Sequence, residues 1–155
     1  MLTRGVVTLV LFLALAGQAS SQGAALSPSE QNLLRAVNEA RAASGLQPLS
    51  VDVALTRAAR FHSRTLMVRN RLEHGDVAGR LRSFGARGRT LGENLAWGSG
   101  PYARAQAIVR AWLNSPPHRA NLLRPGYRRI GLGAAVGTFA GNNGATVVTA
   151  DFAGG

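Results

Sequence analysis

The sequence predicts a single α+β domain in which helices come first and an antiparallel pair of strands comes last. Apolar residues recur at helical spacing in several stretches between residues 28 and 114. Two strand-like segments, 130–136 and 145–152, flank the turn-rich residues 141–144. About 130 residues follow the N-terminal apolar segment, which is the size of one domain with one core. These observations favour a helical part packed against a small sheet.

The N-terminal residues have the pattern of a secretion signal. A short basic start is followed by the apolar run 6–16, which is shorter than the roughly 20 residues that span a bilayer. Small residues that suit a cleavage site come next. We therefore predict a signal peptide over 1–19, a short linker over 20–26 and one domain over 27–155, in a secreted or periplasmic protein. An uncleaved membrane anchor is the alternative.

The composition limits the function classes. The chain has no cysteine, which excludes thiol chemistry and favours a bacterial exported protein without disulfides. Its 18 basic residues are all arginine and face only 7 acidic residues, giving a net charge of +11. The arginines are spread along the chain with little aromatic interleaving, so we expect no sequence-specific nucleic acid partner. Attraction to an anionic membrane surface remains open, and we expect a monomer.

The predicted helices have recognisable ends. The first begins at the capping box Ser27-Pro28-Ser29-Glu30 and ends near Gly45. The second begins near residues 50–52 and carries an apolar stripe of Leu55, Ala59, His62 and Leu66. A short helix over 77–84 starts from the cap Asp76. A third long helix, 102–114, has to end at residue 115 because two prolines follow it, and a helical turn is expected over 119–123.

Glu93 is the most unusual residue of the predicted strand 92–98. Its neighbours are apolar or glycine, and a buried carboxylate is costly unless it is paired, hydrogen-bonded or bound to a metal. His74, at the start of a loop, and His118, which follows the rigid Pro116-Pro117 pair, are the candidate partners. His62 lies on the apolar stripe of the second helix, which is more typical of a core histidine than of a ligand.

Five segments in the order of the chain resemble the motifs of the CAP superfamily, which groups cysteine-rich secretory proteins, antigen 5 allergens and pathogenesis-related class 1 proteins. They are Ala58-x-x-x-His62-Ser63, Leu72-Glu73-His74, Gly92-Glu93-Asn94-Leu95-Ala96, the segment 112–123 and Ile130-Gly131-Leu132-Gly133. The resemblance covers about residues 31–152 and is of the bacterial type. It implies a three-layer α-β-α sandwich with a small antiparallel sheet.

The resemblance also implies a central cleft formed by His74, Glu93 and His118. Animal members have a second acid where this chain has Ser115, so the cleft holds three ligating groups instead of four. Two imidazoles and one carboxylate can bind a divalent metal, zinc first, with positions left open for water. His62, Asn94, Trp112, Arg119 and Asn121 are the residues that we expect to support the motif structurally.

Three classes of function stay open because fold and function are loosely tied in such families. The first is a ligand-binding module for a lipid or another small molecule, with apolar character near Trp97, Trp112 and Tyr127. The second is a hydrolase that uses a metal-bound water, or Ser115 with a histidine. The third is an envelope interaction protein whose cleft is purely structural.

Overall fold

The structure is a computed structural model and describes residues 25–155. The predicted signal peptide, 1–19, and residues 20–24 of the predicted linker lie outside the described residues. The helical elements are α1 (Pro28–Ala43), α2 (Val53–Arg69), α3 (Val77–Ser83), the 3₁₀ turn η1 (Gly100–Ala103), α4 (Ala105–Asn114) and α5 (Pro116–Leu122). The strands are β1 (Ser50–Val51), β2 (Thr90–Gly98), β3 (Tyr127–Phe139) and β4 (Asn142–Gly154). Over residues 25–155, none of the helices combines the length and apolar character needed to span a bilayer.

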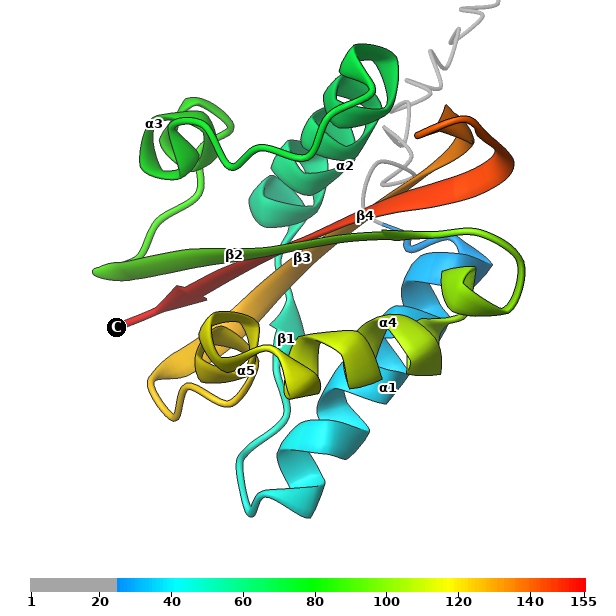
Figure 1. Cartoon of the computed structure of the whole chain (residues 1–155). Coiled ribbons are helices and arrows are strands. Elements are labelled where there is room, and N and C mark those ends of the chain that lie inside the picture. The colour runs from blue at the N-terminus through cyan, green and yellow to red at the C-terminus, as the bar shows by residue number, and fades with distance from the viewer. Residues whose placement is uncertain (1–24) are drawn as a thin grey trace, which may run out of the picture.

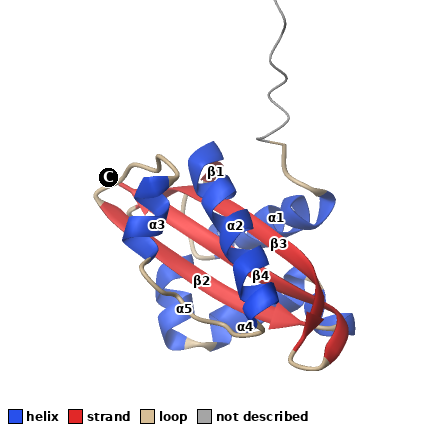
Figure 2. Cartoon of the chain, turned by 90° about the horizontal axis from the view of Figure 1, so that it is seen from above, coloured by secondary structure: helices blue, strands red, loops and turns tan. Residues whose placement is uncertain are grey.

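The elements form three layers around a central sheet. The strand order is β1-β3-β4-β2, with α2 and α3 on one face and α1, α4 and α5 on the other (Figure 1; Figure 2). This arrangement confirms the α+β class and the α-β-α sandwich. The sheet is mixed rather than purely antiparallel, because β1 pairs in parallel with β3. A strand of two residues carries too little alternation to be recognised in the sequence.

Two helix caps lie where the sequence places them, since Ser27 and Glu30 form the capping box of α1 and Asp76 caps α3. Asp52, the last residue of the range 50–52 in which the second helix was expected to begin, caps α2. The proline pair ends α4 as predicted but also starts α5 at Pro116, three residues before the predicted helical turn. Proline suits the first turn of a helix because the N–H that it lacks would have no partner there.

The C-terminal hairpin is longer than predicted. Its turn consists of Ala140 and Gly141, both with positive φ (48° and 78°), as a tight two-residue hairpin requires. The predicted connector 141–144 is therefore mostly part of β4. The sequence placed the turn too late because Gly144, which lies inside β4, is a turn-forming residue like Gly141. Both glycines have a positive φ, so the residue type does not tell which of them is in the turn.

The glycines of β3 let α2 lie directly on the sheet. A Cβ on Gly131 would lie 2.0 Å from the carbonyl carbon of Leu55, and one on Gly133 would lie 2.3 Å from that of Ala59. Ser63 of α2 donates a hydrogen bond of 2.9 Å to the carbonyl of Gly133. This close approach brings α2, with His62, over the middle of the sheet.

A buried arginine that sequence analysis did not single out fixes the position of α5. Arg41 of α1 has no exposed surface, and its guanidinium donates to the carbonyls of Gln47, Leu122 and Arg124 at 2.9–3.1 Å. These carbonyls lie in the loop after α1 and around the end of α5. Arg41 therefore ties the helix that carries His118 to the first helix of the chain.

Candidate functional site at the edge of the sheet

Glu93 lies on β2, which is an edge strand of the sheet. It is 4% exposed, as the apolar neighbours predicted. Successive side chains of a strand point to opposite faces, so Glu93 contacts the α2 and α3 side whereas Asn94 contacts α5. The edge position brings both helical layers close to this one strand.

The carboxylate of Glu93 has partners from three other elements. His74 Nδ1 donates to Glu93 Oε1 over 2.7 Å, and the guanidinium of Arg80 on α3 donates to Glu93 Oε2. His62 Nε2 lies 3.7 Å from Glu93 Oε2. The structure thus joins His74 to Glu93 as sequence analysis expected, and it adds Arg80 and His62.

Asp151 is a second buried acid in this cluster that sequence analysis missed. It is the direct cross-strand neighbour of Glu93 and has no exposed surface. Arg80 Nη2 lies 3.9 Å from its Oδ1, and no described donor reaches either of its carboxyl oxygens. A proton on Asp151 removes the need for a donor at one of these oxygens, because a protonated carboxyl can itself donate to Glu93.

Burial raises the pKa of Asp151 well above the ordinary value of 3.8, and the charge of Glu93 raises it further. Two carboxylates side by side cannot both ionise without a large cost. The two acids therefore carry about one negative charge between them, and the positive charge of Arg80 balances it. We call Glu93, His62, His74, Arg80 and Asp151 the edge site. The signal that could have revealed Asp151 is an acid inside the apolar strand pattern 145–152.

His62 is held by the backbone. Its Nε2 donates to the carbonyl of Glu73 over 3.0 Å, which fixes the tautomer because a carbonyl only accepts. Burial lowers the pKa of His62, and the nearby Glu93 charge opposes this effect. His62 is thus a buried, hydrogen-bonded histidine that also faces the cluster.

His118 forms no hydrogen bond or ion pair with Glu93 and is paired with Ser115. Its Nδ1 shares a hydrogen bond of 2.7 Å with Ser115 Oγ, one helical turn earlier. Burial lowers the pKa of His118, and repulsion from a charge on His74 lowers it further. Ser115 precedes the first residue of α5, but its hydroxyl bonds to the His118 ring and does not cap the helix. The serine and the histidine therefore form a dyad.

Two of the other motif residues, Asn94 and Asn121, hold α5 against β2. Asn94 Nδ2 donates to the carbonyl of His118 over 2.9 Å, and Asn121 Nδ2 donates to the carbonyl of Glu93 over 3.0 Å. Trp112 is buried and donates from Nε1 to the carbonyl of Leu95. Arg119 is exposed and its side chain forms no hydrogen bond with another described residue.

The described residues do not fit a preformed zinc site. No group of three His, Asp or Glu side chains between residues 25 and 155 has the arrangement to hold a metal ion. Both oxygens of Glu93 already accept hydrogen bonds, one of them from the cation of Arg80. A zinc ion held by His74 and Glu93 would have to replace the proton between His74 Nδ1 and Glu93 Oε1, and the nearby positive charge of Arg80 would repel it. Zinc binding by His74, Glu93 and His118 stays a prediction.

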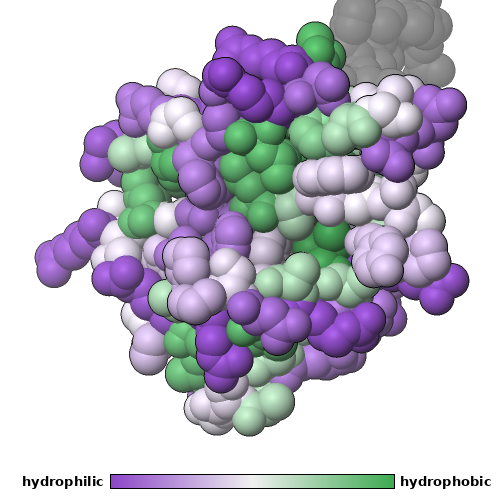
Figure 3. All heavy atoms as spheres, in the orientation of Figure 1, coloured by the Kyte–Doolittle hydropathy of each residue, from purple (hydrophilic) through white to green (hydrophobic). Residues whose placement is uncertain are grey.

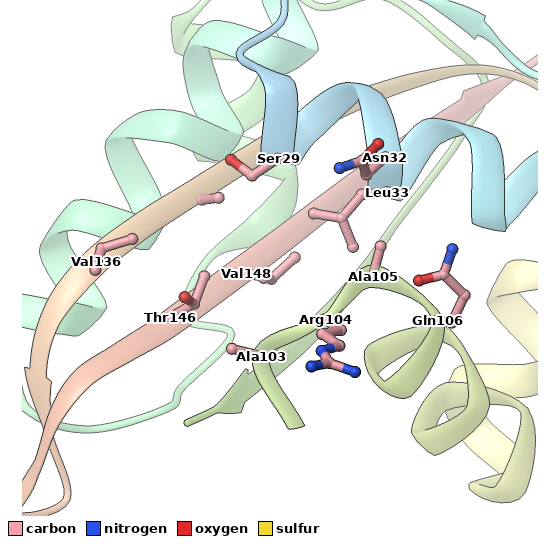
Figure 4. Close-up of a pocket in the computed structure, with 11 residues that line it drawn as sticks. Ser29, Asn32, Leu33, Ala103, Arg104, Ala105, Gln106, Val136, Thr146 and Val148 are labelled. Carbon is pink, nitrogen blue, oxygen red and sulfur yellow. The ribbon is translucent and has the colours of Figure 1, made fainter. Parts of the chain in front are cut away.

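Three of the cavities formed by residues 25–155 lie beside these elements. The largest, about 490 Å³, lies between α2 and α3 and is lined by Phe61, His62, Arg80 and Phe84 among others. A cavity of about 220 Å³ lies between α1, the sheet and the start of α4, with Ser29, Asn32, Arg104 and Thr146 around it (Figure 4). The third, about 270 Å³, is lined by Trp97, Gly98, Ser99, Tyr102, Ala107, Ile108 and Ala111. We call this third cavity the Trp97 groove.

The aromatic residues expected near a ligand separate into two groups. Trp112 and Tyr127 are 1% and 0% exposed and belong to the core. Trp97 is 37% exposed, packs against Phe139 at 5.3 Å between ring centroids, and lines a cavity. Only Trp97 of the three is therefore available to a ligand.

The chain is similar to several known proteins. The model of the cysteine-rich secretory protein family (CAP) matches residues 34–152. The chain is 33% identical to YkwD of Bacillus subtilis over 74% of its own length and 45% of that protein. It is 34% identical to pathogenesis-related protein 1C of Nicotiana tabacum over 75% of its own length and 59% of that protein.

The solved structures agree on the fold. An extracellular protein containing an SCP domain from Bacillus anthracis superposes with a TM-score of 0.69 at 23% identity, over 84% of this chain and 45% of that one. An outer surface protein of Borrelia burgdorferi superposes with a TM-score of 0.64 at 21% identity, over 79% of this chain and 89% of that one. The chain spans about half the length of the curated relatives that it matches.

Proposed function

Because the chain belongs to the cysteine-rich secretory protein (CAP) family, we propose that it is an extracellular binding module that takes a small apolar ligand, such as a single lipid chain, in the Trp97 groove. The edge site then serves to hold β2, α3 and the loop before it in place. The observation that carries this proposal is an apolar cavity whose lining includes two partly exposed aromatic residues, Trp97 of β2 and Tyr102 of η1.

Trp97 and Tyr102 are 37% and 74% exposed, and the rest of the lining is mostly small or apolar. Large aromatic surface left in water beside a concave apolar wall is typical of a binding site. The volume of about 270 Å³ is below the roughly 300–1,000 Å³ of pockets for drug-sized ligands. One hydrocarbon chain or one ring therefore suits the groove better than a bulky molecule.

Fluorescence of Trp97 tests this proposal. The chain has only two tryptophans, so Trp112→Phe leaves Trp97 as the single reporter. We expect a brominated fatty acid to quench Trp97 with saturation, because Trp97 lines the groove and bound bromine atoms would lie within quenching range of it. Ala107→Gln should abolish the saturable quenching by filling the groove from α4.

The matched control is Ala120→Gln, an exposed position on α5 outside the groove, which should quench as the parent does. The proposal fails if the fatty acid does not quench Trp97 in a saturable way, or if the two glutamine variants behave alike.

A hydrolase is the second candidate, because Ser115 Oγ and His118 Nδ1 lie within 2.7 Å. In this scheme the oxygen of Ser115 attacks an ester carbonyl while His118 takes its proton, and His118 then gives that proton to the alcohol as it leaves. Water, deprotonated by His118, later attacks the acyl-serine, which releases the acid and restores the Ser115 hydroxyl. The lowered pKa of His118 keeps the ring neutral, as a base requires. Against this, no described carboxylate is bonded to His118 to orient it.

Turnover of a fluorogenic ester by purified protein tests the dyad. If Ser115 is a nucleophile, Ser115→Ala and His118→Ala should each lower the rate by about 100-fold or more, and a fluorophosphonate should add its mass to Ser115. Asn114→Ala, one residue earlier and exposed, is the control. Equal rates in all variants would exclude Ser115 and His118 as catalytic residues.

Metal binding is a separate proposal that calorimetry decides. A zinc titration at neutral pH should give heat if His74, Glu93 and His118 can close around the ion. Since Arg80 competes for Glu93, Arg80→Gln should bind zinc more tightly than the parent chain. The absence of heat with both proteins would discard the zinc site.

A further inference from the structure

The outer face of α2 carries a stripe of apolar and basic side chains that the proposed ligand groove does not use. The stripe consists of Val53, Arg57, Phe61, Arg64 and Val68, which we call the α2 ridge. Spacings of three and four residues place these side chains on one side of the helix. The opposite side packs on the sheet through buried residues. Val68 is 86% exposed, and Val53 and Phe61 are each 48% exposed.

The positive charge of the α2 ridge is not neutralised locally. The helix contains no acidic residue, and Arg57 and Arg64 are exposed without a salt bridge to another described residue. Glu73, just beyond the end of the helix, is already bonded to Arg69 and Arg71. The ridge therefore presents cations that need a partner from outside the chain.

The apolar part of the α2 ridge forms a continuous surface with α3. The rings of Phe61 and Phe84 lie 5.5 Å apart. A shallow hollow of about 270 Å³ is lined by Phe61, Arg64, Thr65, Val68 and Arg69. Thr65 donates its hydroxyl to the carbonyl of Phe61, so it offers no donor to a ligand. Figure 3 shows apolar and hydrophilic side chains side by side in the upper part of the molecule, where α2 and α3 lie.

We propose that the α2 ridge docks on an anionic phospholipid bilayer. Phe61 and Val68 would enter the boundary between head groups and acyl chains, and Arg57 and Arg64 would meet the lipid phosphates while their aliphatic stems cover apolar surface. A soluble acidic macromolecule could use the arginines alone, whereas a bilayer also takes up the exposed apolar side chains, such as Val68, that lie beside them. The mixture of cations with unpartnered apolar side chains therefore favours lipid.

The docked orientation is compatible with the proposed function and independent of it. The α2 ridge lies on one side of the sheet, whereas α4, which lines the Trp97 groove, lies on the other (Figure 1). The groove would face away from the bilayer that α2 contacts. Failure of ligand binding in the groove would leave the membrane proposal unaffected.

Co-sedimentation with vesicles tests the proposal. The chain should bind vesicles of phosphatidylcholine mixed with phosphatidylglycerol, release from them as salt is added, and ignore phosphatidylcholine alone. Arg57→Gln with Arg64→Gln should weaken binding about 25-fold, because each arginine near an anionic surface contributes about fivefold. Phe61→Ser with Val68→Ser should also weaken it. Val68→Ser alone is informative because its side chain has almost no contacts to lose on mutation.

The control for charge is Arg104→Gln with Arg110→Gln, two exposed arginines at α4, which change the net charge by the same amount. The control for apolar exposure is Val136→Ser, at 72% exposure on β3. Both should bind as the parent does. Equal loss in the two arginine pairs would overturn the proposal in favour of diffuse charge attraction. Binding to polyglutamate as tight as to vesicles, unaffected by the serine variants, would overturn it in favour of an acidic macromolecule.

Discussion

Arg80→Met is expected to lower the free energy of unfolding by about 3–5 kcal/mol, the cost of leaving one partner of a buried ion pair without the other. The side chains of Arg80 and Glu93 are 10% and 1% exposed, so water cannot replace the lost guanidinium. Methionine keeps much of the length of arginine and fills the same space. The loss should therefore report the missing charge and not a cavity.

Chemical denaturation measures this loss, with Arg82→Met as the control because Arg82 is exposed on the same helix. Adding Glu93→Gln to Arg80→Met should recover part of the stability, since the charge left unpaired is then removed. A loss of less than about 1 kcal/mol, the range of surface ion pairs, would show that Arg80 does not hold the edge site together.

Asp151→Asn is expected to become increasingly stabilising relative to the parent chain as the pH rises. The pKa of Asp151 is raised in the folded state by burial and by Glu93. Its contribution is therefore complete below the ordinary value of 3.8 and is lost as the pH rises through the raised pKa. Between those two values the parent should lose up to about 1.4 kcal/mol per pH unit from this one group. Asparagine has no proton to lose and can still donate to Glu93.

Unfolding free energies of both proteins between acidic and alkaline pH test this prediction. Other groups act in the opposite direction, because the lowered pKa values of His62 and His118 destabilise the fold as the pH falls. The difference between variant and parent removes those contributions. Asp76→Asn, at an exposed helix cap, is the control. A difference that stays constant across the pH range would show that Asp151 is not protonated in the folded protein.

Local signals in the sequence predicted most of the elements because those signals act over a few residues. Ser27, Asp52 and Asp76 cap helices through hydrogen bonds to residues three positions later, and such caps are visible in the chain itself. The paired prolines end one helix for an equally local reason. Their second effect, starting α5, depends on the direction the chain takes afterwards, and there the prediction was three residues late.

The burial of Glu93 was predictable in the same way. Apolar neighbours and flanking glycines mark a covered strand, and a charge there needs partners. His74 was expected as a partner and bonds to Glu93 directly. Arg80 gave no such signal, because it is one of 18 arginines and nothing local distinguishes it from those in solvent.

The sequence by itself determined the order of helices and strands, the caps that begin them and the presence of an acid inside an apolar strand. Only the tertiary structure decided which side chains meet that acid. Strand pairing across the sheet places Asp151 beside Glu93, and the packing of α3 against the edge strand brings Arg80 between them, whereas His118 turns to Ser115. The physical reason is that periodicity and capping involve near neighbours in the chain, whereas pairing between strands joins residues 58 positions apart, 93 to 151, and depends on how the whole chain closes around its core.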